Sequence, residues 1–228
     1  MLFTESRIEA LVNSDDFPNW LDVGMRRHYR RVARPSGMSP AMSYGRHSGP
    51  APSTARCAAV AILLFRRDGR WHLPLTERPA TLARHAGQIS LPGGVIDAGE
   101  SSIAAVQREL NEELGFYETL LEIGRLADCY VFASDFLVTP WILATYEPTI
   151  SWRPHDCEVK SVVELPLEVL LDESAIGQTT IERGPLVLNA PCLRIGTACI
   201  WGATSVILNE LADLIRTLPD DSLLTDSP

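Results

Sequence analysis

Residues 94–116 read GVIDAGESSIAAVQRELNEELGF, and this stretch determines the expected fold. Apolar residues in its second half recur at helical spacing, which predicts a helix from about Ser102 to Leu114 that ends at Gly115. The residues that share one apolar face of this helix are Ile103, Val106, Leu110 and Leu114. The helix is therefore expected to pack on a core and to turn its remaining faces outward.

A second face of this helix is unusually acidic. Glu109 and Glu113 are four residues apart, and Glu112 lies on their flank. Like charges at this spacing destabilise a bare helix by about 0.2–0.5 kcal/mol, whereas carboxylates gathered around Mg²⁺ are favourable because that ion prefers oxygen ligands. Arg108 can pair with Glu112 or with Glu100. The pattern indicates a Mg²⁺ site, and a solvated acidic face is the alternative.

The same segment resembles the Nudix box, G-x5-E-x7-R-E-U-x-E-E-x-G-U with U an apolar residue, at every fixed position. The resemblance implies a hydrolase with an α/β/α sandwich fold, a mixed β-sheet and a Mg²⁺ cofactor, with Mn²⁺ as an alternative. The metal ligands that it implies, directly or through water, are Glu109, Glu112, Glu113 and the carbonyl of Gly93. It also implies that Arg108 and Glu100 form a structural ion pair.

The rest of the chain agrees with such a fold. Short apolar runs bounded by turn residues predict strands, and these cover residues 58–65, 71–76, 121–132, 137–146 and 159–165. A further hairpin is expected across residues 179–188, and helices over residues 166–172 and 203–218. Strands and helices alternate irregularly, which favours an α/β (α+β) fold with a mixed sheet over a doubly wound parallel sheet.

The first 56 residues differ in character from the remainder of the chain. Residues 1 to about 34 are predicted to be helical, with Pro18 suited to a first helical turn. Residues 35–56 are rich in Pro, Ser and Gly and are predicted to form a linker. The expected organisation is an N-terminal helical extension and linker over residues 1–56, followed by a Nudix hydrolase domain over residues 57–228.

A second resemblance lies just before the acidic helix. Residues 75–94 read LTERPATLARHAGQISLPGG and are similar to the signature of the coenzyme A pyrophosphatase branch of Nudix enzymes, L-L-T-x-R-S-x3-R-x3-G-x3-F-P-G-G. The positions that agree are Thr76, Arg78, Gly87, Pro92, Gly93 and Gly94. The positions that depart are Pro74, Pro79, Ala83 and Leu91, with Arg84 one residue after the expected second Arg.

This second resemblance implies a substrate and its contacts. Arg78 and Arg84 are the candidate phosphate ligands, because a guanidinium group matches phosphate geometry bidentately. The implied reaction is Mg²⁺-dependent cleavage of coenzyme A, or a derivative, to adenosine 3′,5′-bisphosphate and 4′-phosphopantetheine or its acyl form. Glu109, Glu158 and Glu164 are candidates for the general base.

Two alternatives to this reaction stay open. The departure at Ala83 leaves room for another nucleoside diphosphate derivative, such as ADP-ribose, a nucleotide sugar, a dinucleotide or a nucleoside triphosphate. A non-catalytic Nudix binding or regulatory module is the third interpretation, although all three box glutamates are present.

Composition limits the class of protein. A net charge of −9 over 228 residues argues against non-specific nucleic-acid binding, which needs Lys and Arg to meet phosphates. Five widely spaced cysteines without a C-x-x-C pair suggest neither a disulfide framework nor a zinc site, so they are predicted to be small buried hydrophobes. No secretory signal or membrane-length apolar run is seen. We expect a soluble cytoplasmic protein, and the resemblance implies a homodimer.

Overall fold

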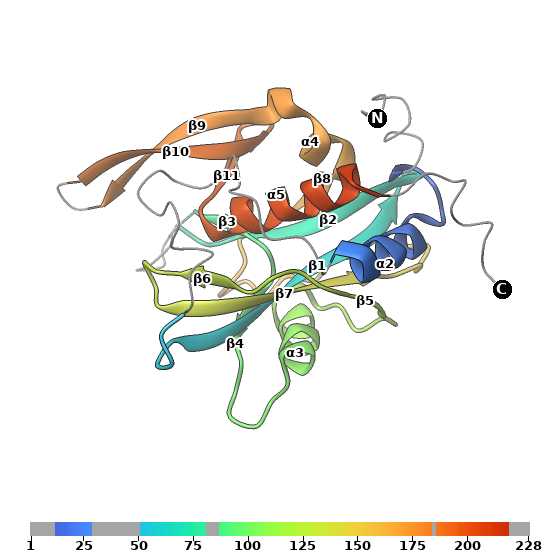
Figure 1. Ribbon diagram of the computed structural model, residues 1–228, viewed down its shortest axis with the longest axis horizontal. Coiled ribbons are helices and arrows are strands. Elements are labelled where there is room, and N and C mark those ends of the chain that lie inside the picture. Colours follow the sequence, from blue (N-terminus) through green and yellow to red (C-terminus); the bar gives the residue numbers. More distant parts are fainter. Residues whose placement is uncertain (1–11, 29–50, 81–86, 184–185, 219–228) are drawn as a thin grey trace.

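The computed structural model describes residues 12–28, 51–80, 87–183 and 186–218. Figure 1 shows a layered arrangement in which helix α3 (Ser102–Leu114) lies on one side of a central sheet. Helices α2 (Phe17–His28) and α5 (Ala203–Arg216) lie on the other side. The predicted α/β/α sandwich is therefore confirmed. No helix within these ranges is both long and apolar enough to cross a membrane.

The central sheet has eight strands and is mixed. The strands are β1 Arg56–Arg67, β2 Arg70–Glu77, β3 Ile89–Ser90, β4 Gly93–Val95, β5 Leu121–Arg125, β6 Cys129–Val131, β7 Phe136–Ala144 and β8 Ser161–Pro166. Strand β1 runs parallel to β7 and antiparallel to β2 and β4. The predicted hairpin of residues 58–76 is thus the β1–β2 pair, which extends a few residues beyond its predicted ends.

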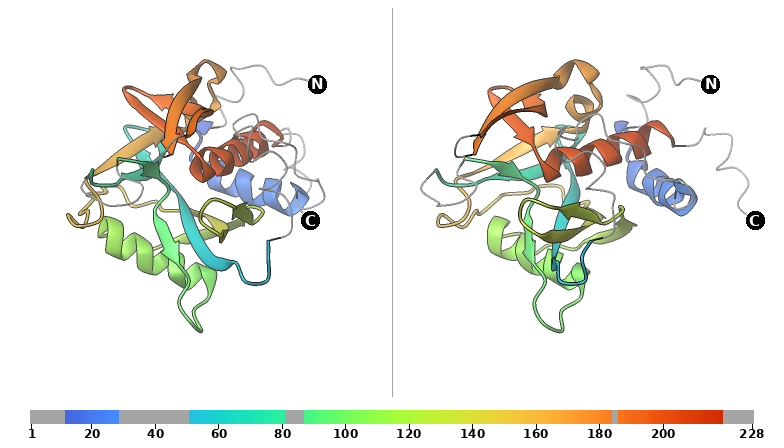
Figure 2. Two further views of the ribbon diagram at one scale, coloured as in Figure 1. Left: turned by 90° about the vertical axis from the view of Figure 1, so that its left-hand side faces the viewer. Right: turned by 60° about the vertical axis from the view of Figure 1, so that its left-hand side comes forward.

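Strand β1 is apolar on both faces because helices cover both sides of the sheet. Ala59, Leu63 and Phe65 point toward α3 and join a cluster with Val106 and Leu110. The alternate side chains of β1, including Ile62 and Leu64, point to the side of α2 and α5. Figure 2 shows the same separation of the helices from two further directions. The sheet thus separates two apolar cores.

Helix α2 belongs to one of these cores. Phe17 and Leu21 are fully buried, and Phe17 contacts the ring of Trp71 on β2. The indole of Trp71 donates a hydrogen bond to the carbonyl of Ser14 at 2.8 Å. Residues 12–28 of the predicted extension therefore pack against the sheet. The remaining parts of that extension, residues 1–11 and 29–50, lie outside the described residues.

One predicted strand is two strands in the structure. The expected run over residues 121–132 divides into β5 and β6, and both pair with β7. Between them, the amide of Leu126 donates to the carbonyl of Pro140, and the amide of Ala127 donates to the side chain of Glu210 on α5. Pro140 of β7 has no N–H to donate to a neighbouring strand, which interrupts the pairing at this point. The prediction of a single strand over residues 121–132 was therefore wrong.

A smaller, three-stranded sheet precedes α5. It consists of β9 (Ile176–Arg183), β10 (Leu186–Ile195) and β11 (Ala198–Trp201), after the short helices α4 (Leu167–Leu171) and η2 (Glu173–Ala175). The predicted hairpin over residues 179–188 forms the distal part of β9 and β10. Strand β11 was not predicted, because four residues behind a two-residue turn carry too little periodicity.

The prediction for the cysteines was partly wrong. Cys192 and Cys199 form a disulfide across β10 and β11. Of the other three, Cys129 is buried, whereas Cys57 and Cys157 are exposed. The available signal was two cysteines on either side of Gly196, which has a positive φ of 57° in the turn between the two strands. That spacing suits an antiparallel hairpin, and it is not one of the C-x-x-C or framework patterns that were considered.

Candidate active site

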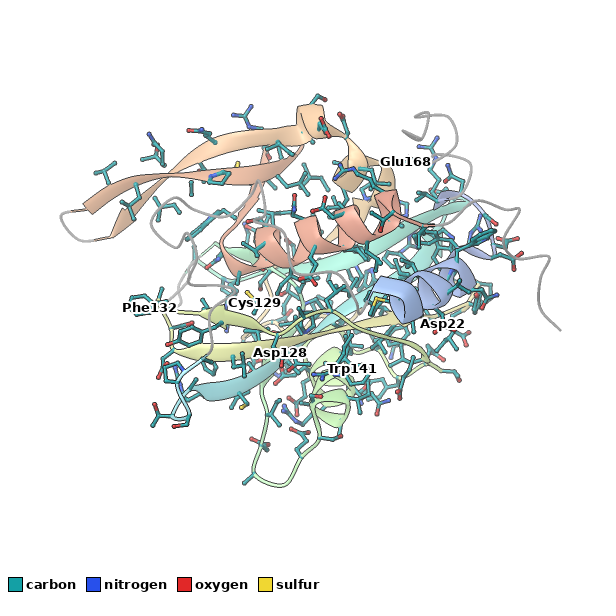
Figure 3. All side chains as sticks on the ribbon, in the orientation of Figure 1. Asp22, Asp128, Cys129, Phe132, Trp141 and Glu168 are labelled. Carbon is teal, nitrogen blue, oxygen red and sulfur yellow. A yellow bond between two sulfur atoms is a disulfide. The ribbon has the colours of Figure 1, made fainter. Side chains whose placement is uncertain are left out.

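Helix α3 has well-defined ends. The Ser101 hydroxyl accepts a hydrogen bond from the amide of Ala104, which caps the first turn. Gly115 ends the helix in the left-handed conformation with φ 60°, and its amide returns to the carbonyls of Leu110 and Asn111. Trp141 of β7 donates its indole N–H to Ser102 at 3.0 Å, and Figure 3 shows its label beside α3. These contacts fix the position of α3 on the sheet and so the position of its acidic face.

Strand β4 approaches both β1 and α3 closely because it begins with two glycines. Gly93 has a φ of 149°, and a Cβ there would lie 2.6 Å from the Cα of Val60. At Gly94, a Cβ would lie 2.7 Å from Cδ of Glu109. Only glycine permits these approaches. The backbone of β4 therefore forms a wall of the acidic site.

Glu109 and Glu113 are both withdrawn from solvent. Glu113 is 5% exposed, and its Oε2 accepts a hydrogen bond from the amide of Gly93 at 3.0 Å. Burial raises the pKa of Glu113 to about 7, and the nearby charge of Glu109 acts in the same direction. Burial likewise raises the pKa of Glu109, although Arg108 opposes it. Two carboxylates with raised pKa values thus face one small region.

Arg108 connects the helix to the loop that precedes it. Its Nε and Nη2 donate to the two carboxylate oxygens of Glu100, each at 3.1 Å. Its Nη1 donates to Glu109 at 2.8 Å and to Glu112 at 3.1 Å, and Nη2 also donates to the carbonyl of Val95. The bond to Glu100 is the main reason that the pKa of Arg108 is raised. Both predicted partners of Arg108 are therefore found.

Arg78 comes to the same region from the end of β2. Its backbone is held by Gln88, whose carbonyl accepts the Arg78 amide at 3.1 Å, and by Gly87, whose amide donates to the Arg78 carbonyl. Within the described residues, its Nε is buried without a hydrogen-bond partner. Its positive charge is close enough to lower the pKa of Glu113. A guanidinium group with a free donor therefore lies beside the acidic pair.

A loop after β7 brings a further carboxylate. The amides of Arg153 and His155 donate to the carbonyls of Leu114 and Glu113, which fixes this loop to the end of α3. Glu158 follows in the same loop, and its negative charge raises the pKa of both Glu109 and Glu113. Glu158 is exposed. It thus adds negative charge to the site from a separate element.

Glu164, the other candidate base, has a different environment. Its carboxylate accepts hydrogen bonds from the Arg67 guanidinium and, at 2.6 Å, from the indole of Trp152. Burial opposes ionisation of Glu164, but the bonds from Arg67 and Trp152 together hold its pKa below the ordinary value. Trp152 also packs edge-on against Phe65. Glu164 is therefore occupied in a structural network between β8, β1 and the loop after β7.

The donor set suits a hard divalent cation. Buried carboxylates with raised pKa values are stabilised by a nearby cation, and Mg²⁺ prefers such oxygen ligands. Within the described ranges, no three acidic, His or Cys side chains converge on a preformed ion position. In this arrangement Arg108 bonds to Glu109 and Glu112, while Gly93 bonds to Glu113. The residues fit the ion chemically, and binding would exchange some of these bonds.

The structure brings most of the predicted site residues together. Glu113 bonds to Gly93 and lies near Glu109, and the charge of Arg78 lowers the pKa of Glu113, whereas Glu112 is outermost, with a side chain 56% exposed. Arg84 lies outside the described residues. The sequence did not show that Glu158 and Glu164 have different surroundings, because both lie within or directly beside the same predicted strand.

Comparison with known proteins agrees with this geometry. The NUDIX domain model matches residues 55–182, which is more than half of the chain. Two relatives named "Uncharacterized Nudix hydrolase NudL", from Salmonella paratyphi B and Salmonella newport, are each 33% identical over 165 residues, or 72% of this chain and 85% of the relative.

A solved structure gives the same fold. The structure titled as a Nudix hydrolase from M. Smegmatis, RenU, superposes with a TM-score of 0.51 and covers 73% of this chain and 89% of that one. Its sequence identity of 17% makes this a likeness of fold alone. On the family match and the two sequence relatives, the chain belongs to the Nudix hydrolase family and is a pyrophosphohydrolase.

Proposed function

We propose that this enzyme cleaves the diphosphate of coenzyme A, or of an acyl derivative, with Mg²⁺ as its cofactor. Water adds to one phosphorus atom, the bridging P–O bond breaks, and the products are adenosine 3′,5′-bisphosphate and 4′-phosphopantetheine or its acyl form. Nudix hydrolases generally use divalent metal cations, and Mn²⁺ is the alternative here.

The observation that carries this proposal is the position of Arg78. This residue belongs to the stretch that resembles the coenzyme A branch. The charge of its guanidinium group lowers the pKa of Glu113. A buried donor without a partner is costly, and a phosphate oxygen of the substrate would satisfy Nε of Arg78. The site thus offers carboxylates that can bind a metal ion and, in Arg78, a guanidinium group that can bind a phosphate. Arg84 is proposed as a second phosphate contact from the same stretch.

The residues of α3 and β4 have separate roles in this proposal. When bound, Mg²⁺ offsets the charge of the diphosphate and orients it for in-line attack by water. We assign its binding to Glu109, Glu112 and Glu113, with the carbonyl of Gly93 as a further ligand. Arg108, through both oxygens of Glu100, positions the loop before α3 and so the ligands.

We assign proton acceptance to Glu158 rather than to Glu164. The negative charge of Glu158 raises the pKa of both Glu109 and Glu113, which supports a position near the site. As an exposed carboxylate on a backbone-anchored loop, it is free to accept the proton of the attacking water. Glu164 already accepts two charged or polar donors, Arg67 and Trp152. A base held in such a network has little capacity for another proton.

The two glutamates are expected to respond differently to the same substitution. Glu158→Gln should lower kcat by roughly 10²-fold or more, because a general base contributes about 10²–10⁴-fold, and should leave the melting temperature unchanged. Glu164→Gln should lower stability by about 1–2 kcal/mol, because it weakens a charge-assisted hydrogen bond to Arg67, and should largely keep kcat. Steady-state kinetics and thermal denaturation of both variants test this, and the reverse pattern would contradict the assignment.

Arg78 is expected to act mainly on substrate binding. Arg78→Ala should raise KM for coenzyme A by roughly 10–100-fold, which corresponds to a charge-assisted interaction of about 1.5–3 kcal/mol. Arg78→Lys should recover part of this loss, since it keeps the charge without the fork of donors. Arg125→Ala is the matched control, because Arg125 makes an exposed ion pair with Asp128. An unchanged KM in Arg78→Ala would remove Arg78 from the substrate site.

The substrate assignment is tested by product analysis on a panel. Purified protein is incubated with coenzyme A, ADP-ribose, a diadenosine polyphosphate and a nucleoside triphosphate, each with Mg²⁺ or Mn²⁺. We expect coenzyme A to be cleaved fastest, and Glu113→Gln to slow the cleavage by roughly 10²–10³-fold. Preference for another compound would leave the family reaction intact and overturn the coenzyme A assignment. Absence of cleavage on every compound would favour a binding or regulatory module.

A further inference from the structure

The Cys192–Cys199 disulfide lies in the part of the fold that leads to the proposed substrate site. The two cysteines are seven residues apart and their Cα atoms are separated by 5.9 Å. In the β10–β11 ladder, Cys192 is opposite Trp201 and Cys199 is opposite Arg194. The cysteines are therefore diagonal neighbours on one face of the small sheet. Their bond ties β11 to β10 beyond what the ladder alone provides.

Strand β11 continues into a tight connection with the central sheet. It packs against β3, the short strand that comes directly after Gln88. A Cβ at Gly202, directly after β11, would lie 3.6 Å from the side-chain nitrogen of Gln88. The carbonyl of Gly202 accepts bonds from the hydroxyl of Ser205 and the amide of Val206, which fixes the start of α5. The end of β11 thus lies close to the side chain of Gln88.

Gln88 in turn holds the backbone of Arg78. The Gln88 carbonyl accepts the Arg78 amide at 3.1 Å, and β3 pairs with the end of β2 through Thr76 and Ser90. Arg78 is the group proposed to bind a substrate phosphate beside Glu113. Gln88 therefore lies between the end of β11 and the backbone of Arg78 and contacts both.

The described part of the small sheet is joined to the rest of the fold by side-chain packing rather than by strand pairing. In the described part of the chain, none of its three strands pairs with a strand of the central sheet. Leu193 and Ile200 anchor it by burial in the apolar core, and Ile195 and Ala198 pack against that core, whereas the disulfide links β10 to β11 within the small sheet. Cys199 is half-buried, whereas Cys192 is fully buried, so a reductant would approach the bond from the Cys199 side. The oxidation state of this bond is thus suited to control how firmly β11 holds its neighbours.

We propose that the Cys192–Cys199 disulfide is a redox-sensitive positioning element for the Arg78 side of the substrate site. In the oxidised protein, β11 holds β3 and Gln88 in place, and Arg78 is ordered for phosphate binding. In the reduced protein, β11 loosens and substrate binds more weakly, while the carboxylates on α3 are unaffected. The role of Arg78 in this inference rests on the proposed function.

The redox step is an ordinary thiol–disulfide exchange. A thiolate of a dithiol attacks Sγ of Cys199, the S–S bond breaks, and Cys192 leaves as a thiolate that takes up a proton. The second thiol of the reagent then attacks the mixed disulfide and releases Cys199. Two electrons pass from the dithiol to the protein, and the reagent becomes a cyclic disulfide.

The first test counts thiols in the full-length protein. Titration of denatured, unreduced protein should find three free thiols, those of Cys57, Cys129 and Cys157, among the five cysteines. Treatment with dithiothreitol before denaturation should raise the count to five. A count of five before reduction would overturn the inference at its first step.

The second test measures the coupling to the site. Reduction should raise KM for the diphosphate substrate by about fivefold, within the usual range of coupling between sites, with less effect on kcat. Amide hydrogen exchange of residues 87–90 should increase at the same time. The double variant Cys192→Ser/Cys199→Ser should behave as reduced protein under both conditions, whereas Cys157→Ser should keep the full response to dithiothreitol.

These measurements separate the two proposals. If no diphosphate is cleaved in either redox state, the proposed function fails, and hydrogen exchange alone decides whether the disulfide positions residues 87–90. If the thiol count changes from three to five while KM and exchange stay constant, the disulfide is a local staple and the inference is overturned.

Discussion

Glu113→Gln is expected to lose activity and gain stability. The carboxylate of Glu113 is proposed to bind the metal, and loss of one such electrostatic group costs roughly 10²–10³-fold in kcat. The amide is nearly the same size, and its oxygen can still accept the Gly93 amide that now bonds to Oε2. The substitution therefore removes a charge from a buried position without removing a contact.

The stability gain results from the pKa of Glu113. Burial raises this pKa to about 7 in the folded, metal-free protein from an ordinary value of 4.5. Between these two values the folded state binds more protons than the unfolded state, so stability falls as pH rises from 4.5 to 7 and stays low above it. At pH 8 the charged group costs about 3 kcal/mol, and the Gln variant avoids this cost.

Thermal denaturation in the presence of a chelator measures the effect. Glu113→Gln should melt roughly 5–10 °C above the parent protein at pH 8, since 1 kcal/mol corresponds to about 2–4 °C for a chain of this size. The difference should shrink toward pH 5, where the parent is protonated. Added Mg²⁺ should stabilise the parent at pH 8 by mass action and leave the variant unchanged. A variant less stable than the parent at pH 8 would contradict the burial argument.

Local patterns predicted the helix that carries the candidate site, its buried face and its end. The spacing of Val106, Leu110 and Leu114 sets which face of α3 is buried, so the face that carries Glu109 and Glu113 can be derived from the sequence alone. The stop at Gly115 is also predictable, because a left-handed residue is needed there. These features depend on neighbours within one or two turns, and periodicity reports such neighbours directly.

Contacts between distant segments were not predictable in the same way. Arg78 and Glu113 are 35 positions apart, and only the pairing of β2, β1 and β4 places them in one site. Glu158 and Glu164 stand six positions apart, yet the charge of Glu158 raises the pKa of Glu113, whereas Glu164 bonds to Arg67. The disulfide depends on the turn that reverses the chain between β10 and β11. To predict any of these contacts, one would need to know how the strands pair and in which register.

The two glycines of β4 show how strand register and helix position combine at the site. Gly93 lies against the backbone of β1, where the Cα of Val60 would be 2.6 Å from an added Cβ. Gly94 instead lies against the carboxylate of Glu109, whose Cδ would be 2.7 Å away. Gly93 thus permits β4 to approach β1, and Gly94 permits β4 to approach Glu109, a proposed metal ligand. Adjacent substitutions should therefore have different consequences.

Gly93→Ala is expected to be strongly destabilising. Its Cβ would overlap backbone that cannot move without breaking the β1–β4 pairing, and its φ of 149° is unfavourable for alanine. Overpacking and backbone strain cost about 1–3 kcal/mol each, so a loss of about 3–5 kcal/mol is expected. Thermal denaturation should show a melting temperature lower by roughly 10 °C or more.

Gly94→Ala is expected to fold and to lose activity. The atoms that its Cβ would meet belong to the end of the Glu109 side chain, which can rotate away from the wall of the site. Stability should fall by less than about 2 kcal/mol, while displacement of a proposed metal ligand should lower kcat by roughly 10²-fold.

Gly99→Ala provides the matched control for both glycine variants. Gly99 also has a positive φ, 83°, and an added Cβ there meets nothing within 4 Å. It should show the cost of backbone strain alone, about 1 kcal/mol, with kcat unchanged. If Gly94→Ala retains full activity, Glu109 does not need its observed position, and the assignment of Glu109 to the metal would be wrong. If Gly93→Ala is as stable as Gly99→Ala, the close approach of β4 to β1 does not limit the fold.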